Sequence, residues 1–172
     1  MMDLLRQLEE YRPFNEQEER DRNIIIRCLK EEKDIFTRDN AMAHMTASAW
    51  VVNRQRTKVL MAYHNIYQSW SWLGGHADGE QDLLQVAVRE VKEETGLTVL
   101  DYRFNKSEYF AKSNTLMVNF ACTVDSENFT LRKGEVDRAG WFSVEEARAQ
   151  IYHDSLAEKF LLSAIEKRLY QA

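Results

Sequence analysis

Four of the six glycines of this 172-residue chain lie between residues 74 and 96, at the two ends of a segment with helical periodicity. In that segment apolar residues recur at positions i, i+3, i+4 and i+7, which are Leu84, Ala87, Val88 and Val91. This spacing predicts an amphipathic helix over about residues 82–95, with Gly96 as its C-terminal stop. Because glycine adopts backbone conformations that other residues avoid, unusual backbone geometry is expected around this helix.

Strand and helix patterns alternate along the rest of the chain. Period-two patterning predicts strands, which are residues 47–52, 58–64, 67–73, 97–104, 108–110, 116–124 and 136–142. Helical patterning predicts further helices, which are about residues 15–32, 144–151 and 156–169. No linker rich in Pro, Gly or Ser divides the chain, and its length is that of about one domain. We therefore predict one α/β domain over residues 41–172, preceded by an N-terminal helical extension over residues 1–40.

The extension carries its own helix signals. Asn15 followed by Glu18 has the spacing of an N-cap with a carboxylate at the third helical position. Apolar residues then form a stripe, which consists of Ile24, Ile25, Cys28 and Leu29. Such a stripe is stable only when it is buried, either against the domain or against a second copy of the chain. A homodimer is therefore left open.

Composition excludes several classes of function. Lys and Arg number 23 and Asp and Glu number 28, so the formal net charge is −5. Tight binding of a long nucleic acid depends on cations placed against phosphates, and is not expected. The longest apolar runs are short and the first residues are acidic, so we expect no membrane span, no signal peptide and a cytoplasmic location. Two cysteines, Cys28 and Cys122, are too few for a disulfide framework.

The predicted helix over residues 82–95 carries a cluster of carboxylates. Glu90, Glu93 and Glu94 project from one face of a helix with 3.6 residues per turn. Like charges at these spacings repel, and the negative end of the helix dipole adds to the cost. A divalent cation would remove both costs, and Mg2+ and Mn2+ prefer oxygen ligands. On these residues alone, a metal site and a solvated acidic face both remain open.

The segment as a whole resembles the Nudix box, GxxxxxE followed by seven residues and REUxEExGU, where U is aliphatic. The matching residues are Gly75, Arg89, Glu90, Val91, Glu93, Glu94, Gly96 and Leu97. One position departs from the pattern, because Gln81 stands where the box has its first glutamate and Glu80 lies one residue earlier. A second, weaker similarity lies at residues 140–147, with the sequence GWFSVEEA. The resemblance covers about residues 45–150.

Resemblance to the Nudix hydrolase family implies an α/β/α fold, in which a mixed sheet is sandwiched between helices. It also implies Mg2+-dependent hydrolysis, with Mn2+ as an alternative, of a small nucleoside diphosphate linked to another group X. The implied metal ligands are the carbonyl of Gly75 and the carboxylates of Glu90, Glu93 and Glu94. Bound cations would neutralise the anionic linkage and activate the attacking water. Arg89, four residues before Glu93, is expected to hold the Glu93 carboxylate in position.

The general base is less constrained than the metal ligands. Members of the family use either a box glutamate, here Glu90 or Glu94, or a carboxylate from a later loop, here Glu135 or Asp137. We favour a box glutamate.

Three residues are candidates for substrate binding. His76 directly follows the glycine pair and could contact a phosphate, and Glu135 could contact substrate from the later loop. Trp72 could stack on a base, although an aromatic residue on a strand more often packs in a core.

Two other functions exist on this fold. One is a non-catalytic domain that binds a nucleotide sugar as a sensor; such domains often have eroded boxes, whereas here the metal-binding part is intact. The other is an isomerase of isopentenyl diphosphate, which needs a catalytic cysteine in a strand ahead of the box. No cysteine lies between residues 29 and 121, which disfavours the isomerase. The group X is not identified by the sequence.

Overall fold

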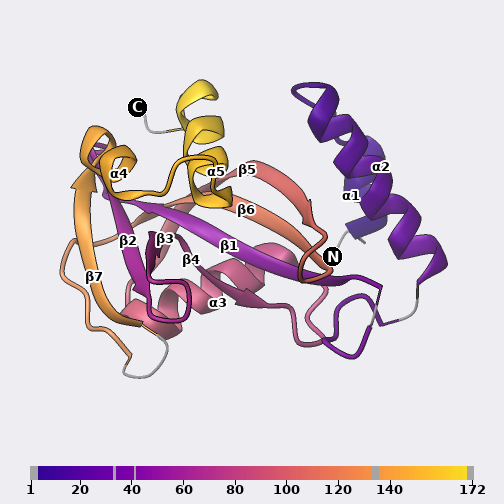
Figure 1. Ribbon diagram of the computed structural model, residues 1–172, viewed down its shortest axis with the longest axis horizontal. Helices are drawn as coiled ribbons and strands as arrows, with labels where there is room; N and C mark the ends of the chain where they lie inside the picture. The colour runs from indigo at the N-terminus through magenta and orange to yellow at the C-terminus, as the bar shows by residue number, and fades with distance from the viewer. Residues whose placement is uncertain (1–3, 33, 41, 133–135, 170–172) are drawn as a thin grey trace.

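The structure is a computed structural model that describes residues 4–32, 34–40, 42–132 and 136–169. Its elements are, in order, α1 (Leu4–Glu10), α2 (Glu16–Glu31), β1 (His44–Val52), β2 (Lys58–His64), β3 (Ser69–Ser71), β4 (Leu73–His76), α3 (Leu83–Thr95), β5 (Val99–Phe110), β6 (Thr115–Val124), β7 (Val136–Ser143), α4 (Val144–Gln150) and α5 (Leu156–Glu166). A seven-stranded sheet lies between α3 on one face and α4 and α5 on the other (Figure 1). The predicted α/β/α fold is confirmed.

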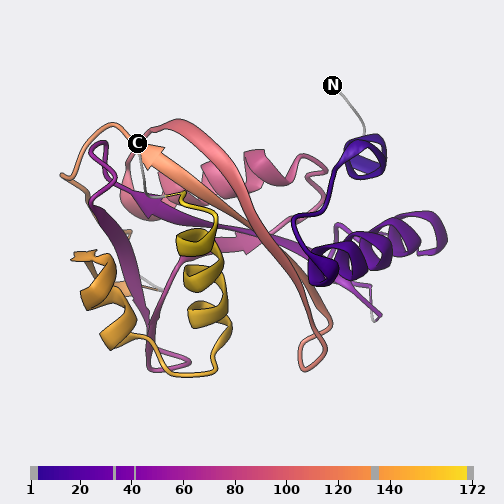
Figure 2. The same cartoon turned by 90° about the horizontal axis from the view of Figure 1, so that it is seen from above.

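The central strand β1 determines the topology of the sheet. It pairs in parallel with β6 along its whole length, and β5 continues the sheet antiparallel to β6. On its other side β1 pairs with β4 through Ala47 and Gly75, and with β2 through Val51 and Leu60. Strand β2 then diverges from β1 (Figure 2). It pairs with β3 and with β7. The sheet is therefore mixed, and β4 lies beside the first half of β1.

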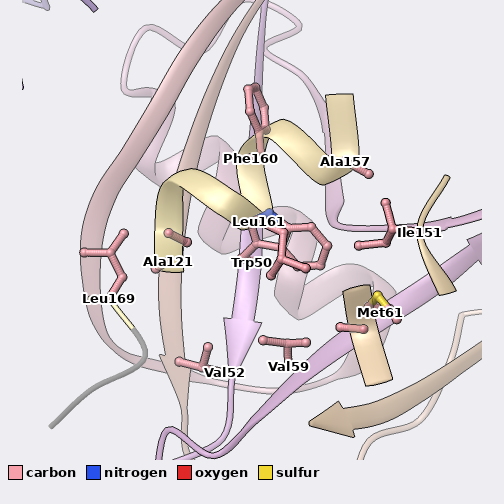
Figure 3. Packing of buried hydrophobic residues seen from close by; sticks show 12 residues of the cluster. Trp50, Val52, Val59, Met61, Ala121, Ile151, Ala157, Phe160, Leu161 and Leu169 are labelled. Atoms are coloured by element: carbon pink, nitrogen blue, oxygen red, sulfur yellow. The ribbon is translucent and has the colours of Figure 1, made fainter. Parts of the chain in front are cut away.

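The two faces of β1 contribute to different parts of the core. Ala49 and Val51 belong to the cluster that packs under α3, whereas Trp50 and Val52 belong to the cluster under α4 and α5. Figure 3 shows Leu161 of α5 beside Trp50 in the second cluster. This alternation follows from the period of two along a strand. Helices cover both faces, so the end of β1 is buried on both sides.

Two strand predictions were wrong in detail. Strand β5 is continuous, where the sequence pattern predicted a break before residue 108. The register shifts between Phe104 and Lys106, and the buried Asn105 side chain donates to Asn119 Oδ1 at 2.8 Å and to the carbonyl of Phe160 at 2.9 Å. A β-bulge with a buried polar residue interrupts the alternation that the prediction used. The predicted strand over residues 67–73 is also split into β3 and β4, and β4 continues through both glycines.

The N-terminal stripe packs against the domain. Helix α2 begins after Asn15, whose side chain accepts a hydrogen bond from the backbone N–H of Glu18 at 2.9 Å, as the sequence predicts. Ile25 is 3% exposed and shares a core cluster with Met45 and Leu83. The sequence left two partners open for the stripe, the domain and a second copy of the chain. The structure shows the stripe packed against the domain. The boundary at residue 40 and the formation of a homodimer remain predictions.

A buried ion pair joins α2 to the C-terminal end of the described chain. Glu18 is 2% exposed and pairs with Lys167, and it also accepts hydrogen bonds from Tyr11 Oη at 2.6 Å and from the N–H of Phe14 at 2.8 Å. Burial alone would raise the pKa of Glu18, but the bonds from Lys167, Tyr11 and Phe14 outweigh it and hold the pKa below its usual range. The extension is thus attached by charge as well as by apolar contact.

Among the described residues, no helix combines the length and the apolar character that crossing a membrane requires.

Candidate active site

Helix α3 begins and ends as its sequence predicts. The side chain of Asp82 caps the N-terminus by accepting from the N–H groups of Leu84 and Gln85 at 3.1 and 3.2 Å. Gly96 ends the helix with φ of +74°, and its N–H donates to the carbonyl of Lys92. Between these caps the helix buries its apolar face against β1 and β4. This packing brings the glutamates of the helix beside the glycine pair of β4.

The two glycines of β4 make different close contacts. A Cβ at Gly74 would lie 2.6 Å from the carbonyl oxygen of Ala47 and from the Cα of Ser48. A Cβ at Gly75 would lie 2.6 Å from the carboxyl carbon of Glu90 and 2.7 and 2.8 Å from its two oxygens. The Glu90 carboxylate therefore occupies the space that a side chain at Gly75 would take. The structure thus brings together two of the predicted metal ligands.

Arg89 holds Glu90, and the prediction that it holds Glu93 is wrong. Its Nη2 atom donates to Glu90 Oε1 at 2.9 Å and to the carbonyl of His76 at 3.0 Å. Both acceptors lie at the interface of α3 with β4. The Glu90 side chain at this interface is 17% exposed, whereas the side chain of Glu93 is 48% exposed. Hydrogen bonds to charged groups are stronger where water is excluded, which favours the inner acceptors. Arg89 therefore ties Glu90 to β4.

The other two box glutamates differ in exposure. Glu93 accepts from Arg132 Nη1 at 3.2 Å in an exposed ion pair, and Glu94 is half-buried. Within the described ranges, the ligand atoms of the three box glutamates do not form a group within 4.8 Å of one another. The one such group found there is His153, Asp154 and Glu158, at the start of α5 and outside the box. Glu90 is thus held in place by Arg89 beside Gly75.

The loop after the glycines is attached to the N-terminal part of the chain. Arg38 donates from Nε and Nη2 to the two carboxylate oxygens of Asp78, at 2.8 and 2.9 Å. These hydrogen bonds hold the pKa of Asp78 below its usual range. The backbone N–H of Gly79 donates to the carbonyl of Phe36 at 2.8 Å. Sequence reasoning missed Arg38, because a pair separated by 40 positions has no local signal.

The predicted substrate residues have different outcomes. The ring of His76 stacks on that of His44 at 5.2 Å between centroids, and its contact with phosphate remains a prediction. The ring of Trp72 lies 4.9 Å from that of Phe160 and packs in the cluster under α5, on the face of the sheet opposite α3. Of the two roles considered for Trp72, the structure shows core packing, and stacking on a base remains a prediction.

The two loop carboxylates considered as general bases also differ. Glu135 lies outside the described residues. Asp137 is exposed on β7 and accepts a hydrogen bond from Asn65 Nδ2.

Substitution of the two glycines by alanine should separate folding from function. In Gly75→Ala the new Cβ displaces only the flexible end of Glu90, so we expect a loss of activity of about tenfold to hundredfold with little change in melting temperature. In Gly74→Ala the Cβ meets the backbone of β1, which cannot move away, so we expect a clear fall in melting temperature. Calorimetry and turnover measured on both variants test this, and equal stability losses would contradict it.

The chemistry of these donors fits a hard divalent cation. The ligands in question are the carbonyl of Gly75 and the carboxylates of Glu90, Glu93 and Glu94, all of which are oxygen donors. The space at Gly75, which a Cβ would fill, lets a carboxylate approach the backbone of β4. Oxygen ligands of this kind suit Mg2+ and Mn2+.

Together, the mixed sheet, the glycine pair and the glutamate-bearing helix define a domain of the Nudix class. The family model described as NUDIX domain matches residues 42–162, and the chain belongs to the Nudix family.

Curated relatives share this domain. The chain is 35% identical over 83 residues to the NAD-capped RNA hydrolase NudC of Mycobacterium tuberculosis, an alignment that covers 48% of this chain and 26% of the relative. It is 31% identical over 101 residues to the NAD-capped RNA hydrolase NudC of Haemophilus influenzae, covering 56% of this chain and 38% of the relative. The chain thus spans less than half the length of these relatives.

Solved structures share the fold. A NUDIX hydrolase from Nitrosomonas europaea superposes with a TM-score of 0.60 at 23% identity, over 73% of this chain and 90% of that one. The NUDIX domain of Shewanella oneidensis NrtR, solved with ADP ribose, gives a TM-score of 0.63 at 14% identity, over 83% and 97%. An ADP-ribose pyrophosphatase from Streptococcus suis gives 0.59 at 24% identity, over 74% and 93%.

Proposed function

We propose that this chain is a pyrophosphohydrolase that cleaves the diphosphate linkage of a small nucleoside diphosphate linked to a group X. The observation that carries the proposal is the Glu90 carboxylate, which Arg89 holds in the space left by Gly75. A carboxylate whose position is set by packing and by a guanidinium is ready to act without reorganisation. Glu93 and Glu94 follow within about one helical turn, as the Nudix box requires.

The proposed metal is Mg2+ or Mn2+, held by Gly75, Glu90, Glu93 and Glu94. When bound, it would supply positive charge to the phosphate oxygens and assist the attack of water. Arg89 positions Glu90, and its bond to the carbonyl of His76 ties this side of the helix to β4. A box glutamate, Glu90 or Glu94, would accept the proton of the attacking water. Attack is expected at phosphorus.

The substrate is expected to be small and anionic. The net charge of −5 gives no long-range attraction for a polyanion, so local positive charge must attract the diphosphate. The curated relatives are NAD-capped RNA hydrolases, and one structural neighbour is an ADP-ribose pyrophosphatase. These names support a dinucleotide or a nucleotide sugar as the compound to test first.

Hydrolysis in 18O-labelled water tests the proposal. The chain is incubated with Mg2+ and a panel of ADP-ribose, NADH, CoA, dinucleoside polyphosphates and nucleoside triphosphates, and products are analysed by mass spectrometry. We expect label on a phosphate product, none on a sugar carbon, and loss of activity with EDTA. Label on carbon only, or activity that survives EDTA, would exclude the mechanism. Binding of a nucleotide sugar without turnover of any compound would favour the sensor function.

A further inference from the structure

A short segment of the N-terminal extension, residues 34–38, lies beside the turn that joins β4 to α3 (Figure 1). The carbonyl of Ile35 accepts a hydrogen bond from the N–H of Met45 on β1 at 2.8 Å. The Ile35 side chain is 3% exposed and shares a core cluster with Met45. Within the segment, the N–H of Thr37 donates to the carbonyl of Asp34 at 2.8 Å. The segment is therefore anchored to the domain by its backbone and by a buried side chain.

The turn between β4 and α3 has an unusual backbone, because Asp78 has a φ of +48° and Gly79 a φ of +93°. The N–H of Glu80 donates to the carbonyl of Ala77 at 3.0 Å, across these two residues. Positive φ at both central residues is typical of a type I′ turn. Aspartate tolerates this conformation better than most residues, but other contacts still have to offset its cost. We therefore expect the shape of the turn to depend on contacts from outside it.

Segment 34–38 supplies contacts to both central residues of the turn. Arg38 donates from Nε and Nη2 to the two carboxylate oxygens of Asp78, at 2.8 and 2.9 Å. The carbonyl of Phe36 accepts from the N–H of Gly79 at 2.8 Å. A guanidinium that binds both oxygens of a carboxylate fixes its direction as well as its distance. The segment thus holds the side chain of one central residue and the backbone of the other.

The same turn follows the β4 residue that Arg89 binds. The carbonyl of His76 accepts from Arg89 Nη2 at 3.0 Å, and the same nitrogen donates to Glu90 Oε1 at 2.9 Å. A displacement of the turn would move the His76 carbonyl, because two residues separate His76 from the centre of the turn. Arg89 would then lose one of the two acceptors that orient it. Arg38 is therefore linked to the Glu90 carboxylate through a continuous series of contacts.

We propose that Arg38 is a positioning residue of the metal site, which acts on Glu90 through Asp78, the turn and Arg89. The inference rests on the proposed function, because it takes Gly75 and Glu90 as metal ligands. Replacing a residue that orients a metal ligand commonly lowers metal affinity by about 10–100-fold. The effect of Arg38 should be smaller, because it acts through the turn and its side chain is 61% exposed.

This role would make the N-terminal extension part of the site. Arg38 lies before residue 42, where the match to the family model begins. Its contribution concerns the position of the ligands, so it can be measured by metal binding in the absence of any substrate.

The test measures the affinity for Mn2+ alone. Mn2+ is titrated into the full chain, and free Mn2+ is followed by electron paramagnetic resonance. We expect Arg38→Met to raise the dissociation constant for Mn2+ by about threefold to tenfold. Loss of a nearby cation would by itself strengthen Mn2+ binding, so weaker binding reports a change of position rather than of charge. The melting temperature in EDTA should fall by at most about 4 °C, because the pair is partly exposed.

Two further comparisons isolate the pair. Arg6→Met is the matched control, because Arg6 forms an exposed ion pair with Glu10 on α1 at 3.0 Å. It removes the same charge from the extension and should leave the dissociation constant for Mn2+ within about twofold. Asp78→Asn should weaken Mn2+ binding as Arg38→Met does. The double variant should lose no more affinity than either single variant, because residues that act as one unit have non-additive effects.

The outcomes separate this inference from the proposed function. Unchanged Mn2+ affinity in Arg38→Met, or an equal loss in Arg6→Met, overturns the positioning role even if the wild-type chain turns over a panel compound. Mn2+ binding that Arg38→Met weakens, without turnover of any panel compound by the wild-type chain, supports the positioning role and contradicts hydrolysis. Losses that add in the double variant contradict the action of Arg38 through Asp78. Absence of saturable Mn2+ binding by the wild-type chain overturns the inference together with the proposed metal site.

Discussion

Replacement of Glu93 or Glu94 by glutamine should lower turnover by at least about a hundredfold, the range expected when electrostatic stabilisation of a reacting centre is lost. The stability of the metal-free protein should be unchanged or slightly higher, because the box carboxylates repel one another. The Arg132–Glu93 pair that Glu93→Gln weakens is exposed, and such pairs contribute at most about 1 kcal/mol. The measurements are kcat at saturating Mg2+ and melting temperature in EDTA.

Glu145→Gln is the matched control for these variants. Glu145 is an exposed carboxylate on α4, outside the box, and its replacement should leave turnover unchanged. Near-normal turnover in both Glu93→Gln and Glu94→Gln at saturating Mg2+ would contradict their assignment as metal ligands.

Replacement of Lys167 by methionine should destabilise the protein by about 3–5 kcal/mol at pH 7, the usual cost of removing one partner of a buried ion pair. Methionine keeps much of the apolar stem but leaves the charge of Glu18, which is 2% exposed, without its cation. Urea denaturation gives the difference in unfolding free energy. Lys159→Met on α5 is the control, because its ion pair with Glu108 involves a lysine side chain that is 53% exposed and should contribute at most about 1 kcal/mol. Equal losses in the two variants would contradict the role of the buried pair.

The pH dependence of this difference has a defined sign. The pKa of Glu18 is lowered in the folded protein, so its ionised form contributes stability above the unfolded pKa of about 4.3. That contribution is lost as the pH falls through the folded pKa and Glu18 becomes protonated. The gap between wild type and Lys167→Met should therefore be largest near neutral pH and should narrow below about pH 4.

Features with local causes were predictable from the sequence. The N-cap Asn15 and the stop at Gly96 act on groups within a few residues of themselves, so their positions identify the helix ends. The box could be identified because its residues keep a fixed spacing along one loop and one helix. The alternation of strand and helix patterns was likewise enough to predict an α/β domain, whereas the mixed sheet between helices was implied by the resemblance to the Nudix family. The strand pattern failed at Asn105, where burial of a polar side chain breaks the alternation.

Contacts between distant segments could not be predicted in this way. Whether Arg89 pairs with Glu93 or with Glu90 depends on where β4 places the carbonyl of His76, which Arg89 also binds. The space that the Glu90 carboxylate occupies depends on how closely Gly75 approaches α3. The sequence by itself determined the elements, the fold class and the box, since hydrogen-bond spacing and periodicity act locally. Tertiary structure decided which partner each charge takes and which residues hold the turn between β4 and α3, because these depend on packing between elements far apart in the chain.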